Sequence, residues 1–152
     1  MGFRIYIESL KQKGSGMNVL SRRALSNYTE VAATNHKDTK SPHELIKLLF
    51  DGLTDRIAAS RSALAKGNRE DRATSVTKAQ TILWGLRESL DFEKGGDLAV
   101  NLDSLYDYCI RRLTAAHAQE NDEIFSEVMD LMVNIRDAWK EMPTSNKLSK
   151  VQ

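Results

Sequence analysis

Apolar residues recur at alternating spacings of three and four in four stretches of the chain, which is the pattern of amphipathic helices. The first stretch opens with the letters SPHEL, where Ser41 is suited to cap a helix and Pro42 to occupy its first position. Glu44 can complete a capping box with Ser41. We expect this helix to run to about Lys66, with Gly67 as its C-terminal stop.

Three further helices are predicted at short intervals. We expect the second over about residues 69–90, the third from about Leu98 to His117 after a cap at Asp97, and the fourth ending before Pro143. Their apolar stripes are Val76, Ala79, Leu83, Leu86 and Leu90; then Leu102, Leu105, Cys109 and Leu113; then Ile124, Val128, Leu131, Ile135 and Trp139. Four helices with short connections pack most simply as an antiparallel bundle. The sequence therefore predicts an all-α fold with an antiparallel four-helix bundle over residues 41–142.

Polar segments flank the predicted bundle. Residues 17–40 end in NHKDTK, and we expect an N-terminal arm here with at most one short extra helix around residues 20–33. Residues 143–152 are expected to form a flexible tail.

The first 16 residues end in Gly-Ser-Gly, directly before Met17, and this sequence is typical of a flexible linker. We interpret residues 1–16 as a fused peptide with its linker, added to a chain that begins at Met17; a natural turn is the alternative. Helical spacing and strand alternation both fit its apolar residues, which are Phe3, Ile5, Tyr6, Ile7 and Leu10. One hypothesis is a tethered peptide derived from a binding partner, and the other is a vector remnant.

The first predicted helix carries more apolar surface than a bundle helix needs. Leu45, Leu48 and Leu49 occupy one sector of the helical wheel, and a neighbouring sector holds Phe50, Leu53, Ile57 and Leu64. In the third helix Tyr106 and Ile110 widen the stripe in the same way. Two explanations remain open: this helix is the most buried of the four, or the extra sector forms a groove for an apolar partner.

Charge and composition narrow the classes of function. The chain has 22 basic and 21 acidic residues, a balance that argues against a nucleic-acid-binding protein. No apolar run approaches the length of a membrane span and no secretory signal is visible, so we expect a cytoplasmic protein without membrane insertion.

Candidate catalytic and metal-binding groups are few. A single cysteine, Cys109, lies on an apolar stripe and is predicted to fill the core, with no disulfide within the chain. None of the three histidines has a partner at metal-ligand spacing, and His43 in a first helical turn is expected at the surface. We therefore predict no enzyme, no cofactor and no metal site.

Two long motifs carry a resemblance to a known family. SPHELIKLLFDG at residues 41–52 and SLDFEKGGDLAVNLDSLYDYCIRRL at residues 89–113 resemble the flagellin export chaperones of the FliS family. The ending IRDAWKEM at residues 135–142 is also similar to the last helix of that family, and the resemblance spans about Tyr28 to Met142. It implies a helical bundle that binds the disordered C-terminal segment of flagellin in the cytoplasm. The resemblance also implies that the chain prevents premature polymerisation and delivers flagellin to the type III export apparatus of the flagellum.

The resemblance also implies which residues contact the client. Those expected in or beside apolar grooves between helices are Leu45, Leu48, Leu49, Leu102, Leu105, Tyr106 and Ile110. Asn101 and Arg111 are expected to hold polar groups of the client, and Tyr28 in the arm to cover the groove when it is empty. Leu102 and Leu105 could equally be core residues. Other flagellar regulators are further partners, and the alternative function is a helical adaptor that binds another flagellar protein.

Overall fold

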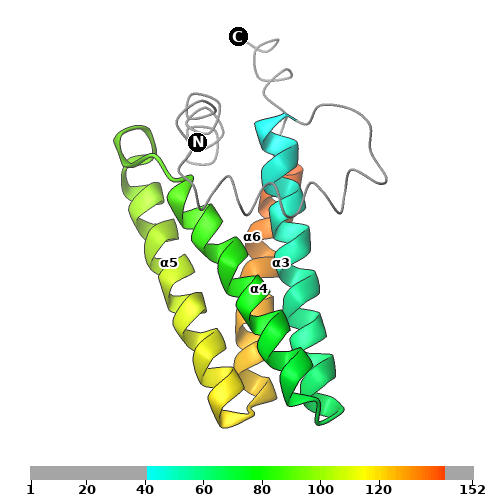
Figure 1. Ribbon diagram of the computed structural model, residues 1–152. Coiled ribbons are helices and arrows are strands. Elements are labelled where there is room, and N and C mark those ends of the chain that lie inside the picture. Colours follow the sequence, from blue (N-terminus) through cyan, green and yellow to red (C-terminus); the bar gives the residue numbers. More distant parts are fainter. Residues whose placement is uncertain (1–40, 143–152) are drawn as a thin grey trace.

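The structure is a computed structural model that describes residues 41–142 (Figure 1). This part of the chain forms four α-helices: α3 (Pro42–Ala65), α4 (Arg69–Glu88), α5 (Phe92–Gln119) and α6 (Asp122–Glu141). Consecutive helices run in opposite directions (Figure 1), which confirms the predicted all-α fold and the antiparallel bundle. The expectations for the fused segment, for the arm with its Tyr28 and for the tail lie outside the described residues.

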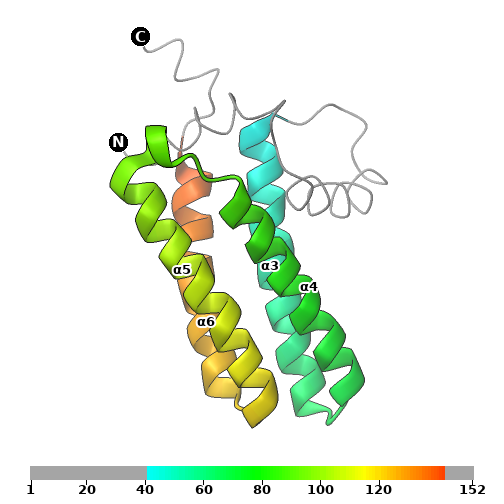
Figure 2. The same ribbon diagram turned by 60° about the vertical axis from the view of Figure 1, so that its left-hand side comes forward.

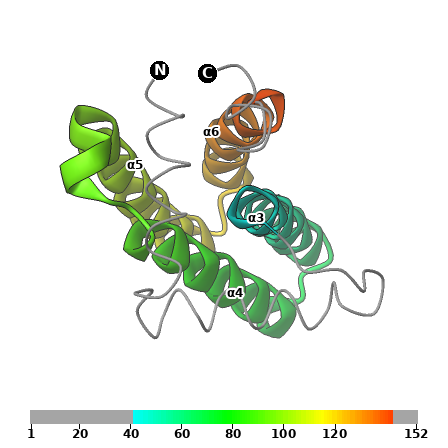
Figure 3. The same ribbon diagram turned by 90° about the horizontal axis from the view of Figure 1, so that it is seen from above.

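The four helices follow one another around the bundle. α3 packs against α4 and α6, and α5 packs against the same two helices from the other side. Seen from above, α3 therefore lies diagonally opposite α5 (Figure 3). Figure 2 shows the two pairs α3–α4 and α5–α6 side by side. The N-terminal end of α3 and the C-terminal end of α6 meet at one end of the bundle, whereas α4 begins and α5 finishes at the other.

The predicted boundary signals of α3 are confirmed. Pro42 is its first residue, and the Ser41 hydroxyl accepts a hydrogen bond of 3.2 Å from the Glu44 amide. The helix ends at Ala65, and Gly67 follows with a φ of 70°, a left-handed conformation that glycine adopts without steric cost. α4 then begins behind Asn68, whose side chain accepts from the Asp71 amide.

The start of α5 differs from the prediction. Its N-cap is Asp91, whose carboxylate accepts from the amides of Glu93 and Lys94, so the expected cap at Asp97 is wrong. One helical turn precedes a kink at Gly96, which has φ 52° and ψ −130°, a conformation open essentially to glycine alone. The Gly-Gly pair interrupts the regular helix, as expected, but it lies inside α5 and does not precede it. Figure 1 shows this first turn set off from the rest of α5.

All four helices contribute to one apolar core. Its largest fully buried side chains include Trp139, Tyr106, Phe50 and Phe125. Along α3, Phe50, Leu53 and Ile57 are completely buried and Leu64 is half-buried, so most of this sector of the wide apolar face belongs to the core. In the other sector Leu49 is buried, whereas Leu45 and Leu48 are half-buried.

Candidate functional site

The residues expected to contact a partner fall into three groups by burial. Leu49, Leu102 and Tyr106 belong to the core, with exposed fractions of 1%, 5% and 0%. Leu45 and Leu48 on α3 and Leu105 and Ile110 on α5 are half-buried, whereas Asn101 and Arg111 are exposed. Direct contact of the core group with a partner stays a prediction.

Leu45 lies on the side of α3 that faces α4. It precedes Ala63 by 18 residues, which is five helical turns, so the two side chains share one face of the helix. Ala63 lines a hollow of about 240 Å³ between α3 and α4. This face of α3 therefore carries large apolar side chains near its N-terminus and small ones near its C-terminus.

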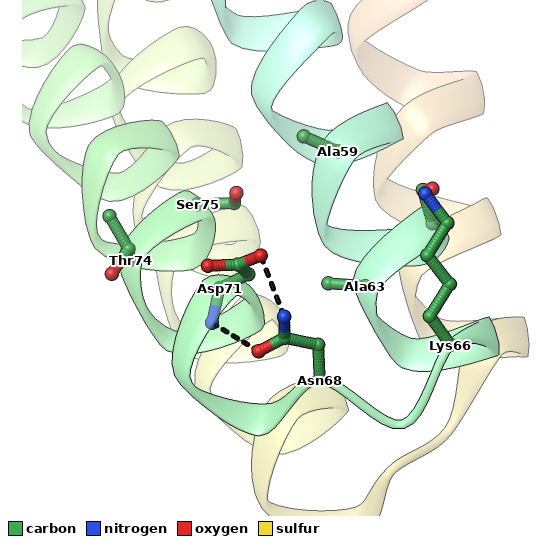
Figure 4. Close-up of a pocket in the computed structure, with 8 residues that line it drawn as sticks. Ala59, Ala63, Lys66, Asn68, Asp71, Thr74 and Ser75 are labelled. Atoms are coloured by element: carbon green, nitrogen blue, oxygen red, sulfur yellow. Dashed lines mark hydrogen bonds between the residues drawn. The ribbon is translucent and has the colours of Figure 1, made fainter.

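Figure 4 shows the hollow between the C-terminal half of α3 and the first turns of α4. Ala59 and Ala63 come from α3, and Ser75 comes from α4. At its rim, the Asn68 amide group donates to the Asp71 carboxylate over 2.8 Å, and the Asp71 backbone amide donates back over 3.0 Å. These two residues satisfy each other's hydrogen bonds. A partner would therefore be received in the hollow by its shape and small side chains and not by reactive groups.

Leu105 and Ile110 lie on different sides of α5. The Gln80 side chain of α4 donates to the Ile110 carbonyl and to the Thr114 hydroxyl one turn later, at 3.0 and 2.8 Å. Leu105 instead shares a face with Tyr108, one turn later, whose hydroxyl donates to Glu127 of α6. The two apolar side chains thus border separate helix junctions, and the structure does not bring them together in one groove.

Arg111 takes part in a cluster of charges between α4 and α5. It donates to Asp107 over 3.1 Å, and Asp107 also accepts from Arg87 over 3.2 Å. Arg87 lies closest to Asp103, at 2.7 Å, and this hydrogen bond is the main cause that raises the pKa of the Arg87 guanidinium. A client carboxylate would therefore compete with Asp107 for Arg111.

One buried pair escaped the sequence analysis, and it corrects the expectation for His43. The His43 ring is 5% exposed and stacks on Trp139 of α6, with centroids 4.9 Å apart and planes inclined by 14°. The Trp139 indole donates to the His43 carbonyl over 3.0 Å. Burial, together with nearby Lys47, lowers the pKa of the imidazole, so it remains neutral. A surface location for His43 was wrong because the end of α6 covers the first turn of α3.

A second buried polar residue, Arg72, lies at the other end of the bundle. Its guanidinium is 2% exposed and donates over 2.9 Å to Nδ1 of His117 on α5, and over 3.3 Å to Glu120. The spacing of Arg72, Val76 and Ala79 places the arginine on the apolar stripe of α4, which was the signal in the sequence. Because arginine is charged, a solvent-exposed position was expected, and its burial was not predicted.

Chemistry at the remaining candidate groups is limited. Cys109 is fully buried, as predicted for a core filler, and burial raises the pKa of its thiol to about 12. Among residues 41–142, no three His, Cys, Asp or Glu side chains are grouped to hold a metal ion. None of the four helices between residues 41 and 142 has the length and apolar content of a membrane span.

Comparison with known proteins relates the chain to one family. Residues 24–146 match the family model described as "Flagellar protein FliS". The chain is similar to the flagellar secretion chaperone FliS of Salmonella typhimurium, with 39% identity over 116 residues, 76% of this chain and 86% of the relative. It is also similar to the flagellar secretion chaperone FliSB of Pseudomonas aeruginosa, with 36% identity over 77% of this chain and 93% of the relative. The Bacillus subtilis flagellar secretion chaperone FliS is 27% identical over 82% and 92% of the two chains.

Proposed function

This chain belongs to the FliS family of flagellar secretion chaperones, which are not enzymes, and on that premise we propose that it is an export chaperone for flagellin. It binds the disordered C-terminal segment of newly made flagellin in the cytoplasm, prevents premature polymerisation and delivers flagellin to the flagellar type III export apparatus. The observation that carries this proposal is the match to the family over residues 24–146.

Apolar side chains outside the core support a groove-binding mode. Leu45 and Leu48 on α3 and Ile110 on α5 are half-buried, so part of each side chain remains available to a partner. An amphipathic client segment that becomes helical can place its apolar side on such positions. Ordering of the client costs conformational entropy, which offsets part of the contact energy and keeps the binding reversible.

Small side chains near the end of α3 extend the same face. Ala59, Ala63 and Ser75 leave the hollow of about 240 Å³ between α3 and α4, large enough to receive side chains of a client. Asn101 is exposed on α5, where it can bond the client backbone, and Arg111 can exchange Asp107 for a client carboxylate. Release then needs a competing surface at the export apparatus and no chemical step.

Titration with a peptide that contains the flagellin C-terminal segment tests the proposal. We expect saturable heat at about one peptide per chain in calorimetry and a gain of helical signal in circular dichroism, because the client orders on binding. Absence of both at high micromolar concentration would contradict the proposal. The alternative, a helical adaptor for another flagellar protein, predicts that absence together with capture of a different flagellar component.

A pair of serine substitutions on α3 locates the groove. Leu48→Ser removes a half-buried apolar side chain, and we expect binding about fivefold weaker or more, since truncating an important interface residue costs more than about 1 kcal/mol. Ala58→Ser is the matched control, because Ala58 is exposed and lies about 80° around the same helix from Leu48 and almost three turns away along it. Equal affinity of both variants would exclude Leu48 from the groove.

A further inference from the structure

One buried hydroxyl group in the hollow between α3 and α4 has no hydrogen-bond partner among residues 41–142. It belongs to Ser75 of α4, which is 8% exposed and lines the hollow. The other serines buried in this range, Ser60 and Ser89, donate over 2.8 and 2.7 Å to backbone carbonyls of the preceding turn. Thr74, the neighbour of Ser75, likewise donates to a carbonyl one turn earlier, over 3.1 Å. The Ser75 hydroxyl is therefore available to a ligand that enters the hollow.

The walls around Ser75 are short and apolar on the opposite side. Figure 4 shows its side chain on the side of α4 that faces α3, where Ala59 and Ala63 line the hollow one helical turn apart. Both alanine side chains end at Cβ and offer no hydrogen-bonding group. At the rim, Asn68 and Asp71 bond to each other. Ser75 therefore supplies the buried polar group of the hollow.

The chemistry of the hollow narrows the class of side chain that it can receive. Its charged lining residues are one cation, Lys66, and one anion, Asp71, so their charges cancel and a buried ionic group would lack compensation. An apolar side chain would cover Ser75 and leave its hydroxyl unpaired. The short side chains of serine and threonine would leave much of the 240 Å³ empty. A carboxamide is larger, is neutral, and both donates and accepts hydrogen bonds.

We propose that the hollow receives an asparagine or glutamine side chain of the client and that Ser75 selects it through a hydrogen bond. This inference rests on the proposed chaperone function and adds a polar determinant to the apolar contacts at Leu45 and Leu48. A client that covers the hollow excludes water from it, so the hydroxyl exchanges water for the carboxamide. Sites that hydrogen-bond a ligand discriminate strongly against analogues that lack the bonding group. Ser75 is thus a specificity-determining residue for the client.

Substitutions of Ser75 test the role of the hydroxyl by calorimetry with the flagellin C-terminal peptide. Ser75→Ala removes the hydroxyl oxygen alone, and alanine favours the helix, so the variant is expected to fold. We expect it to bind the peptide about fivefold more weakly or more, because the client carboxamide loses its partner. Ser75→Thr keeps a hydroxyl and should retain most of the affinity. Ser126→Ala deletes the same group from half-buried Ser126 on α6 and is the control whose affinity stays unchanged.

Three outcomes of this comparison overturn the inference. The first is equal affinity of Ser75→Ala and the wild-type chain. The second is an equal loss in Ser75→Ala and Ser75→Thr, since the hydroxyl would then not be the recognised group. The third is an equal loss in Ser126→Ala, which would make the effect independent of the hollow.

Substitutions in the peptide identify the partner of Ser75. Each asparagine and glutamine is replaced singly by leucine, which lacks a hydrogen-bonding side chain. We expect one replacement to weaken binding to the wild-type chain and to have little further effect on Ser75→Ala, because coupled residues show non-additive losses. Absence of any coupled position overturns this inference alone. Absence of peptide binding by the wild-type chain contradicts the proposed chaperone function and the inference with it.

Discussion

The two ends of the bundle each fix a histidine that remains neutral, but they surround it differently. Where α3 begins and α6 ends, the imidazole of His43 lies against the Trp139 ring and is almost fully buried. Within residues 41–142, no group makes a hydrogen bond with its Nδ1 atom. Where α4 begins and α5 ends, the imidazole of His117 is half-buried and accepts a hydrogen bond from Arg72.

This difference separates two ways of closing a helical bundle. The α3–α6 end depends on apolar and aromatic contact, supplemented by the Trp139 hydrogen bond to a backbone carbonyl. The α4–α5 end depends on a buried cation whose neighbours must accept hydrogen bonds, namely a neutral imidazole and the exposed carboxylate of Glu120. Truncation of a buried side chain should therefore destabilise the α3–α6 end most. Removal of a hydrogen-bond acceptor should destabilise the α4–α5 end most.

Removal of the Trp139 ring should cause the largest loss in the free energy of unfolding. Trp139→Ala deletes a fully buried ring, its stack with His43 and the hydrogen bond to the His43 carbonyl, so we expect a loss of about 3–5 kcal/mol in the free energy of unfolding. Chemical denaturation monitored by circular dichroism measures it. Trp139→Phe is the control that keeps an aromatic ring and loses the indole donor, and it should cost less. Equal losses in the two variants would show that the hydrogen bond, and not the ring, closes this end.

Removal of the hydrogen-bond acceptor of Arg72 should lower the free energy of unfolding by a smaller amount. His117→Ala leaves the buried guanidinium without its imidazole acceptor, and we expect a loss of about 1.5–3 kcal/mol, as for hydrogen bonds to charged groups. Adding Arg72→Met removes the buried charge and should recover part of that loss, because an apolar chain of similar length has no acceptor to lose. A double-mutant cycle in denaturant measures the coupling. Additive losses would contradict a dependence of Arg72 on His117.

Acid should have the smallest effect, and it should act at both ends in the same direction. Burial is the first cause that lowers the pKa of both His43 and His117 below 6.5; Lys47 adds to it at His43, and Arg72 and Arg69 add to it at His117. Glu44 and Glu120 oppose the shift at the respective sites. The unfolded chain therefore binds protons more readily than the folded one. Stability is complete above pH 6.5 and declines as the pH falls through the lower folded values.

Two conservative variants separate the contributions of the two ends to that decline. His43→Phe keeps a ring against Trp139, and His117→Gln keeps an acceptor for Arg72, while each removes one titrating group. We expect each variant to flatten the dependence of the free energy of unfolding on pH, with the larger effect from His43 because it is the more buried. A pH dependence unchanged in both variants would assign the decline to other groups.

Local signals in the sequence were enough to predict most of the fold. Ser41 marks the start of α3 through a hydrogen bond, and Gly67 marks its end through its backbone conformation. Both effects depend on a few neighbouring residues. The start of α5 was missed because the pattern of glycines marks a break at Gly96 but does not reveal that a turn capped by Asp91 precedes it. Burial of His43 was missed for a different reason, since it depends on a helix that begins 79 positions later in the sequence, at Asp122.

The candidate site was less predictable than the fold. Periodicity identifies apolar positions, but it does not distinguish Tyr106, which is fully buried, from Ile110, which is half-buried on the same helix. That distinction depends on how closely α4 and α6 approach each side of α5. The exposed Trp84 was recognisable from its place outside the α4 stripe, whereas the hydrogen bond between Arg87 of α4 and Asp103 of α5 depends on how the two helices pack.

Cys109 makes the interior of the bundle accessible to kinetic measurement. It is the single cysteine of the chain, it is completely buried, and its thiol has a pKa of about 12, so almost no reactive thiolate is present near neutral pH. An alkylating reagent can reach this sulfur only when α5 separates from its neighbours. The rate of alkylation therefore measures how often the bundle opens. A bound partner that holds α5 against its neighbours would lower this rate.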